Sequence, residues 1–125
     1  MADAVGSMPL MGKRVLVVED SREVASGLRS LLLACGADVA GPVATSADAE
    51  RLISKHVADV ALVDLYLRGG ELAYDLIDRL RKKGVRVIVT TGYSDIDVAP
   101  GTATGILRKP FNEAQLLEAL NQGTR

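Results

Sequence analysis

Short, continuous apolar runs recur along the chain from residue 14 onward, separated by longer amphipathic stretches. The runs are Val15–Val18, Val60–Val63, Val87–Val89 and Ile106–Leu107. Continuous rather than alternating apolarity is typical of parallel strands that helices cover on both faces. A weaker run, Val39-Ala40, lies between Asp38 and Gly41-Pro42, a composition that suits the edge of a sheet. The pattern therefore predicts five strands.

The amphipathic stretches predict helices, because their apolar residues recur at spacings of three and four. The first helix follows Ser21, which suits an N-cap, and ends near Gly36. The others begin near Thr45 or Ser46, span about Leu72 to Lys83 before Gly84, and begin after Asn112. The residues predicted to face inward are Val24, Leu28, Leu31, Leu32 and Cys35 in the first helix, Leu52 and Ile53 in the second, Leu76, Ile77 and Leu80 in the third, and Leu116, Leu117 and Leu120 in the last.

Strands that alternate with helices predict an α/β fold, here a single doubly wound five-stranded parallel sheet with helices on both faces. The strand order 2-1-3-4-5 is adopted from known sheets of this class rather than derived. A helix between the fourth and fifth strands should be short or missing, because Gly92, Pro100, Gly101 and Gly105 leave only Ser94 to Ala99 available for it. We expect residues 13–123 to form this one domain and residues 1–12 to be a disordered lead-in.

Composition places the chain among compact domains, with 48% hydrophobic residues and 25% charged residues in 125 positions. A formal net charge of -1 excludes an overall attraction to nucleic acid or to an anionic membrane. The sequence shows neither a secretory signal nor an apolar run long enough to span a bilayer, so we expect a cytoplasmic protein. Cys35 is the single cysteine, which excludes an intramolecular disulfide and predicts a buried apolar role.

Acidic residues follow two of the predicted strands. Glu19 and Asp20 come directly after the first strand, and Asp64 after the third. Ligands of open parallel sheets bind beyond the carboxyl ends of the strands, so these carboxylates converge if the first and third strands are neighbours. Converging carboxylates repel one another, and oxygen ligands favour Mg²⁺ as the compensating cation. Thr91 and Lys109 end the next two strands and could bind an oxyanion attached to Asp64.

These strand ends resemble the motifs of bacterial two-component response-regulator receiver domains, the CheY-like family. The motifs are Val-Leu-Val-Val-Glu-Asp, Ala-Leu-Val-Asp-Leu, Val-Ile-Val-Thr-Thr-Gly-Tyr and Arg-Lys-Pro-Phe, and the match spans about Lys13 to Asn121. The resemblance implies a phosphoprotein of phosphorelay signal transduction in which Asp64 accepts a phosphoryl group. The donor would be a phosphohistidine of a sensor histidine kinase or of a histidine phosphotransfer protein.

The resemblance also implies the roles of the surrounding groups. Asp20, Asp64 and the backbone carbonyl of Tyr66 would bind Mg²⁺, and Glu19 would help directly or through water. Lys109 and Mg²⁺ would supply positive charge, and Thr91 would hydrogen-bond the new phosphoryl group. A cis peptide bond is implied at Lys109-Pro110. Such a protein would not be an enzyme beyond its own phosphorylation and slow self-dephosphorylation.

Three features depart from the usual receiver pattern or narrow it. Ile106 stands where receivers carry an aromatic switch residue, so we expect the signal to leave through the loop from Gly92 to Gly105. Thr91-Gly92-Tyr93 and the turn Arg68-Gly69-Gly70 resemble the FAT GUY subgroup of stand-alone receivers. Tyr66 and Tyr93 lie two positions after Asp64 and Thr91, where their rings could shield an acyl phosphate and slow its loss.

Two other function classes compete with this interpretation. A pseudo-receiver would bind partners without phosphorylation, although all five pocket residue types are present. A small α/β enzyme is less well supported, because neither G-x-G-x-x-G nor a P-loop occurs and His56 is expected to face solvent. The sequence ends at Arg125, soon after the last helix, so we expect no output domain of its own and signalling by contact with a downstream protein.

Overall fold

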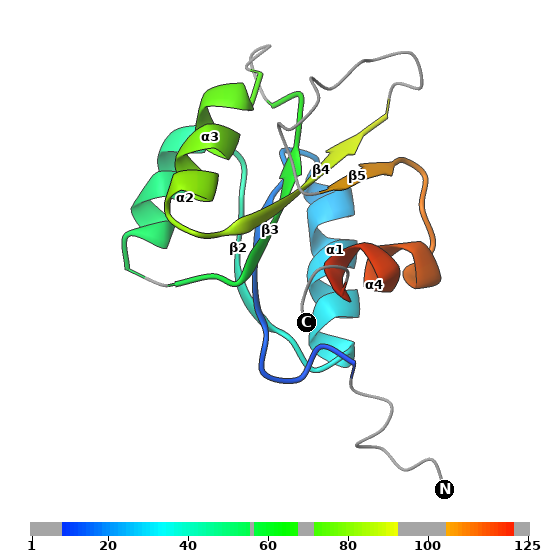
Figure 1. Ribbon diagram of the computed structural model, residues 1–125. Coiled ribbons are helices and arrows are strands. Elements are labelled where there is room, and N and C mark those ends of the chain that lie inside the picture. The colour runs from blue at the N-terminus through cyan, green and yellow to red at the C-terminus, as the bar shows by residue number, and fades with distance from the viewer. Residues whose placement is uncertain (1–8, 56, 68–71, 93–104, 122–125) are drawn as a thin grey trace, which may run out of the picture.

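The computed structural model describes residues 9–55, 57–67, 72–92 and 105–121. Its strands are β1 (Arg14–Val18), β2 (Asp38–Val43), β3 (Val60–Asp64), β4 (Arg86–Thr91) and β5 (Gly105–Arg108). Its helices among these residues are α1 (Arg22–Ala34), α2 (Ser46–Ile53), α3 (Tyr74–Lys82) and α4 (Glu113–Asn121). All strands pair in parallel in one sheet with the order β2-β1-β3-β4-β5, which confirms the predicted fold class (Figure 1).

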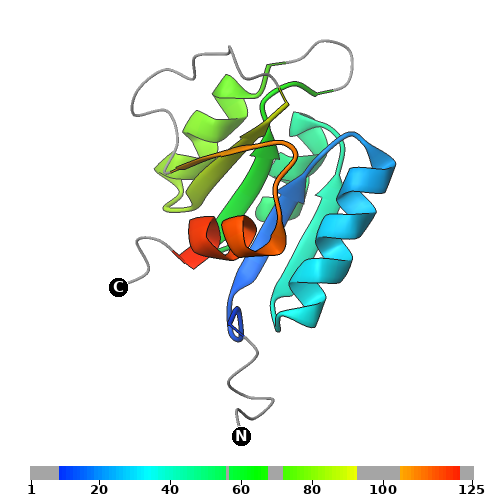
Figure 2. The same cartoon turned by 90° about the vertical axis from the view of Figure 1, so that its right-hand side faces the viewer.

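The sheet lies between two layers of helices, with α1 and α4 on one face and α2 and α3 on the other (Figures 1 and 2). Successive strand residues point to opposite faces and so join different cores. Leu16, Val63 and Val89 belong to a cluster with α2 and α3. Val17 and Leu62 belong to a cluster with α1 and α4. This double coverage explains why the strands are continuously apolar in sequence.

Helix starts follow the capping residues that the sequence indicated. Ser21 and Thr45 accept hydrogen bonds from backbone N–H groups in the first turns of α1 and α2. Asn112 and Gln115 cap α4 reciprocally, each side chain accepting from the other's backbone N–H at 2.8 and 2.9 Å. α3 begins at Tyr74, two residues later than predicted, and Leu72 is exposed.

The inner face of α1 differs from the prediction by one residue. Ala25 is buried, whereas Val24, predicted to face inward, is 36% exposed. The phase of the helix explains the difference, because Ala25, Leu28, Leu32 and Cys35 are spaced by three and four and share one stripe. Cys35 is buried, as predicted.

β2 is the edge strand, as expected, but it continues through Gly41-Pro42 to Val43. Proline is tolerated because an edge strand has one unpaired side. Gly41 has a φ of +94°, and a Cβ there would lie 2.9 Å from the carbonyl oxygen of Val17, so β2 can approach β1 only with glycine at this position.

Residues 93–104, where a short or missing helix was predicted, lie outside the described residues, as do His56, Tyr93 and the Arg68-Gly69-Gly70 turn. Leu10, which the sequence placed in the lead-in, is fully buried in the α1 and α4 cluster. Its backbone N–H donates to the carbonyl of Cys35 at 2.9 Å. The fold therefore includes Leu10.

Candidate functional site

Three carboxylates meet at the carboxyl edge of the sheet. β1 and β3 are neighbours with Val18 opposite Val63, so the residues that follow them, Glu19 and Asp64, emerge side by side. Glu19, Asp20 and Asp64 place one carboxylate oxygen each within 4.8 Å of the others. Glu19 and Asp64 are buried, and Asp20 is half-buried. The strand ends and their register thus produce the convergence that the sequence predicted.

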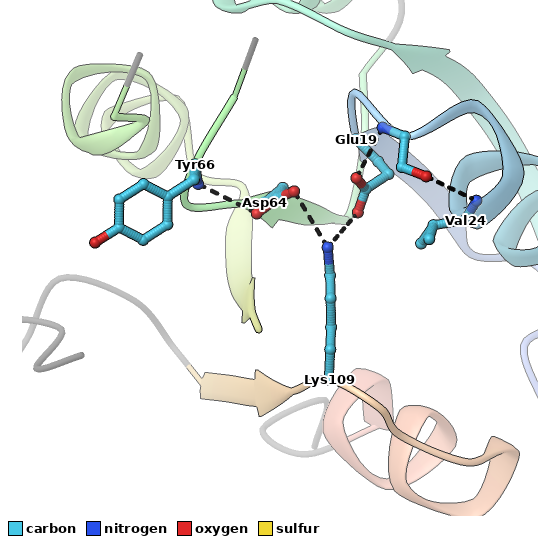
Figure 3. A network of polar contacts seen from close by, with 6 residues as sticks. Glu19, Val24, Asp64, Tyr66 and Lys109 are labelled. Carbon is cyan, nitrogen blue, oxygen red and sulfur yellow. Dashed lines mark hydrogen bonds and ion pairs between the residues drawn. The ribbon is translucent and has the colours of Figure 1, made fainter. Parts of the chain in front are cut away.

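Lys109 reaches this cluster from the end of β5 and points its ammonium between two of the carboxylates (Figure 3). Its Nζ lies 2.8 Å from Oε1 of Glu19 and 3.2 Å from Oδ2 of Asp64. Its backbone N–H donates to the carbonyl of Thr91 at 2.7 Å, which ties the ends of β4 and β5 together. The Lys109-Pro110 peptide bond is cis, as the resemblance implied.

Backbone N–H groups fix the remaining carboxylate oxygens (Figure 3). Tyr66 donates to Oδ1 of Asp64 at 3.1 Å, and Ser21 donates to Oε2 of Glu19 at 3.0 Å. The backbone N–H of Glu19 donates to the carbonyl of Val43 at 2.9 Å. Asp64 and Glu19 are therefore held in place before any ligand arrives.

The site has an excess of negative charge that burial makes costly. Desolvation by burial and the nearby Glu19 carboxylate raise the pKa of Asp64 to about 6, although Lys109 acts in the opposite direction. Burial alone would lower the pKa of Lys109, but Glu19 and Asp64 together outweigh it and raise that pKa. Three carboxylates converge here and Lys109 pairs with only two of them, so the cluster favours a further cation.

The donor set fits a hard divalent ion. All candidate ligands are oxygens, and the three carboxylates are close enough to share one ion. The backbone carbonyl of Tyr66, implied as a further ligand, belongs to the residue whose N–H already holds Asp64. Its part in metal binding remains a prediction.

Thr91 and the Tyr66 ring, both predicted to act at the site, lie near the carboxylate cluster. Thr91 is fully buried at the end of β4, one residue after Thr90, which pairs with Asp64. A contact between its hydroxyl and a phosphoryl group remains a prediction. The Tyr66 ring packs against the α2 and α3 cluster and points away from Lys109 (Figure 3).

Sequence reasoning missed two contacts within the site. It assigned Lys109 to a phosphoryl oxyanion and did not pair it with Glu19, and it treated Ser21 only as a helix cap. Glu19 and Lys109 are 90 positions apart. Only the strand order brings them together, so no local signal could have revealed the pair.

Comparisons with known proteins agree with this geometry. The sequence model of the response regulator receiver domain family matches residues 15–121. The chemotaxis protein CheY of Thermotoga maritima is 25% identical over 118 residues, which cover 90% of this chain and 98% of that protein.

Solved receiver structures have a similar backbone. The signal receiver domain of a modulated diguanylate cyclase from Desulfovibrio desulfuricans is 29% identical, with a TM-score of 0.75 over 86% of this chain and 90% of that chain. The REC domain of the response regulator PhyR from Erythrobacter litoralis is 26% identical, with a TM-score of 0.76 over 90% of this chain and 89% of that chain.

No helix among the described residues is long and apolar enough to cross a membrane. The family match includes every residue of the acidic cluster together with Thr91 and Lys109. The chain therefore belongs to the response regulator receiver domain family and is a module of two-component signalling rather than an enzyme.

Proposed function

We propose that Asp64 accepts a phosphoryl group from a phosphohistidine on a sensor histidine kinase or a histidine phosphotransfer protein. The observation that carries this proposal is the cluster at the carboxyl edge, where three carboxylates converge and the Lys109 ammonium pairs with two of them. Family membership supports a histidine kinase as the general class of partner. Asp64 contacts both the Lys109 ammonium and the Tyr66 N–H, so its carboxylate is held in a defined orientation at the end of β3.

In the proposed transfer, an oxygen of the Asp64 carboxylate forms a bond to phosphorus, and the bond between phosphorus and the imidazole nitrogen of the donor breaks. The donor imidazole leaves with the electron pair and takes a proton. Lys109 lies beside Oδ2 of Asp64 and can follow the charge onto the phosphoryl oxygens. Positioning and charge compensation are the main contributions that proteins make to phosphoryl transfer.

Asp20, Asp64 and the Tyr66 carbonyl are proposed to hold Mg²⁺, with Glu19 acting directly or through water. When bound, Mg²⁺ would neutralise charge on the phosphoryl oxygens and relieve the repulsion among the carboxylates. Asp20 is half-buried and so is the carboxylate of the trio nearest to solvent.

Phosphorylation is proposed to act by conformational change and contact with a downstream protein. Thr91 would move toward the phosphoryl group, and its carbonyl bond to Lys109 would carry that movement into β5. Ile106 on β5 is 45% exposed and has no ring that could switch inward. The loop route between Gly92 and Gly105 remains a prediction, and equal loop hydrogen-exchange rates with and without a phosphoryl mimic would contradict it.

Slow self-dephosphorylation and membership of the FAT GUY subgroup also remain predictions. The Tyr66 ring points away from Lys109 (Figure 3), and Tyr93, the other residue predicted to shield an acyl phosphate, lies outside the described residues. Replacing Tyr93 by alanine should then speed phosphate loss, and replacing Tyr66 should change it less. Equal effects of the two replacements would contradict this division.

Phosphoryl transfer from a purified donor tests the proposal. The protein is mixed with a phosphorylated histidine kinase or phosphotransfer protein, with Mg²⁺ or with a chelator, and the attached phosphoryl group is located by mass spectrometry. Asp64→Asn should abolish acceptance, whereas Asp59→Asn, an exposed aspartate before β3, should leave it intact. Acceptance by Asp64→Asn, or transfer unaffected by the chelator, would contradict the proposal. Undiminished binding of a partner by Asp64→Asn under phosphorylating conditions would favour a pseudo-receiver.

A further inference from the structure

The edge strand β2 contains one more residue than the part of β1 beside it. Leu16 of β1 pairs with Ala40 of β2. The next pair is Val18 with Val43, so two steps along β1 correspond to three steps along β2. The extra residue falls within Gly41-Pro42 and forms a bulge in the strand. Bulges occur often beside functional sites, where they change the direction of the chain.

The bulge requires glycine at position 41. Gly41 has a φ of +94°, a conformation that residues with a side chain rarely adopt. A Cβ on Gly41 would lie 2.9 Å from the carbonyl oxygen of Val17 and 3.0 Å from the backbone nitrogen of Val43. Both of these atoms belong to the backbone, so neither can move aside unless a strand moves with it. Any other residue at this position would therefore push the end of β2 away from β1.

The end of β2 contacts the turn that carries two of the clustered carboxylates. The carbonyl of Val43, directly after the bulge, accepts the backbone N–H of Glu19 at 2.9 Å. Pro42 lines one hollow together with Glu19 and Asp20. Thr45 caps α2 two residues after Val43, which anchors the far end of this segment. The bulge thus determines where β2 meets the turn after β1.

We propose that the bulge in β2 is a positioning element for the site. Through the carbonyl of Val43 it fixes the turn from which Glu19 and Asp20 project. This inference rests on the proposed Mg²⁺ site, to which it adds Gly41 and Val43 as positioning residues. Mg²⁺ tolerates little departure from octahedral geometry, and the carboxylate oxygens now lie within 4.8 Å of one another. A shift of the turn would change these separations and weaken the binding of the ion.

A bulge in an edge strand can also serve only to stop two sheets from joining edge to edge. The two roles make different predictions for the site. A bulge that only protects the edge would leave the Glu19 backbone N–H and the Mg²⁺ affinity independent of Gly41. A positioning bulge links all three. The hydrogen bond between Val43 and Glu19 favours positioning, because protection of an edge needs no contact with the site.

Two measurements on the folded protein test the proposal. Hydrogen exchange followed by NMR reports whether the Glu19 N–H is held, first in the metal-free wild-type protein. Calorimetric titration with Mg²⁺ reports metal affinity. The variants are Gly41→Ala and, as the matched control, Gly84→Ala between α3 and β4. Gly84 also has a positive φ, +88°, but a Cβ there would meet nothing within 4 Å.

We expect slow exchange of the Glu19 N–H in the wild-type protein without metal. Gly41→Ala should speed this exchange and weaken Mg²⁺ affinity about tenfold, which is typical when a group that supports a metal ligand is lost. Gly84→Ala should be less stable, because alanine is strained at a positive φ, but it should keep both the slow exchange and the Mg²⁺ affinity.

Fast exchange of the Glu19 N–H in the wild-type protein would overturn the inference, even if Gly41→Ala failed to fold. A folded Gly41→Ala with wild-type Mg²⁺ affinity would also overturn it, because the bulge would then only protect the edge. So would an equal loss of affinity in Gly84→Ala, since general destabilisation would explain both losses. Absence of Mg²⁺ binding by the wild-type protein would contradict the proposed metal site itself, whereas the Glu19 exchange rate tests the bulge without metal or phosphoryl transfer.

Discussion

Similar charged residues lie at the amino ends of the strands (the amino edge) and at their carboxyl ends (the carboxyl edge), but those at the amino edge are exposed and those at the carboxyl edge are largely buried. At the amino edge, Nη2 of Arg14 lies 2.7 Å from Asp38, and the Arg14 backbone N–H donates to Asp59 at 2.8 Å. The Arg14 and Asp38 side chains are 38% and 63% exposed. At the carboxyl edge, the Lys109 and Glu19 side chains are 24% and 2% exposed. One edge is in water, and the other is largely removed from it.

The difference shows how charge number and burial together make a reactive site. At the amino edge Arg14 forms an ion pair with Asp38, and Lys13 and Arg86 line one hollow with Asp59. The number of basic groups there is therefore close to the number of acidic groups. At the carboxyl edge three carboxylates converge, one ammonium pairs with two of them, and burial strengthens the repulsion among the carboxylates. The amino edge already has its counter-charges. At the carboxyl edge the single Lys109 ammonium leaves negative charge in excess. A bound metal ion would relieve this excess, and an incoming phosphoryl group would add to it.

Mg²⁺ binding should distinguish the two edges most strongly. Mg²⁺ should raise the melting temperature of the wild-type protein, because the folded state binds the ion and the unfolded state does not. Asp20→Asn should reduce that increase by weakening Mg²⁺ affinity about tenfold or more, because a neutral amide replaces a charged oxygen ligand. Asp38→Asn, the matched change at the amino edge, should leave the increase unchanged. Equal losses in both variants would show that Mg²⁺ responds only to overall charge.

The pH dependence of stability should differ between the edges by a smaller amount. Asp64 has a pKa of about 6 in the folded protein, above the value of about 3.9 expected when unfolded. The folded state then binds more protons between these values, so stability should fall as pH rises from about 4 to about 6 and should change little from this group above that. Partial screening by solvent limits the loss to roughly 1 to 2 kcal/mol.

Urea unfolding in the presence of a chelator measures this effect. Asp64→Asn has no carboxyl group to titrate at this position, so its free energy of unfolding should fall less between about pH 4 and about pH 6 than that of the wild-type protein. Asp59→Asn, at the amino edge, should show the same fall as the wild-type protein. A carboxylate stabilised by a salt bridge would make the free energy of unfolding increase with pH, which is the opposite trend. An increase that disappears in Asp64→Asn would therefore contradict a raised pKa at Asp64.

The fold could be predicted because each layer has its own periodicity in the sequence. Strands buried on both faces are continuously apolar, and the N-cap residues Ser21, Thr45 and Asn112 mark the starts of three helices. Boundaries were less certain, since packing decides them. β2 extends through Pro42 because an edge strand needs few hydrogen bonds there, and Leu10 is buried by the end of α1 although no pattern marks it.

The site could be predicted only up to the convergence of its carboxylates. The position of Glu19, Asp20 and Asp64 follows from strand ends, whereas the pairing of Lys109 with Glu19 depends on a side-chain contact across three strand spacings. A sequence shows which chemical groups reach one edge of a sheet. It does not show which of several acceptors a long side chain will choose, because that choice depends on distances near 3 Å.

The smallest effect should come from breaking the charge pair at the amino edge. Arg14 and Asp38 are well exposed, and pairs of this kind contribute about 0 to 1 kcal/mol. Arg14→Met should therefore lower the free energy of unfolding only slightly, and Asp38→Asn should add little in the double variant because the partner is already gone. High salt should shrink even this difference, since exposed charges are screened. Denaturant unfolding of the single and double variants gives the coupling energy. A coupling energy well above about 1 kcal/mol between Arg14 and Asp38 would contradict this expectation. It would mean that exposure does not make the ion pair at the amino edge weak.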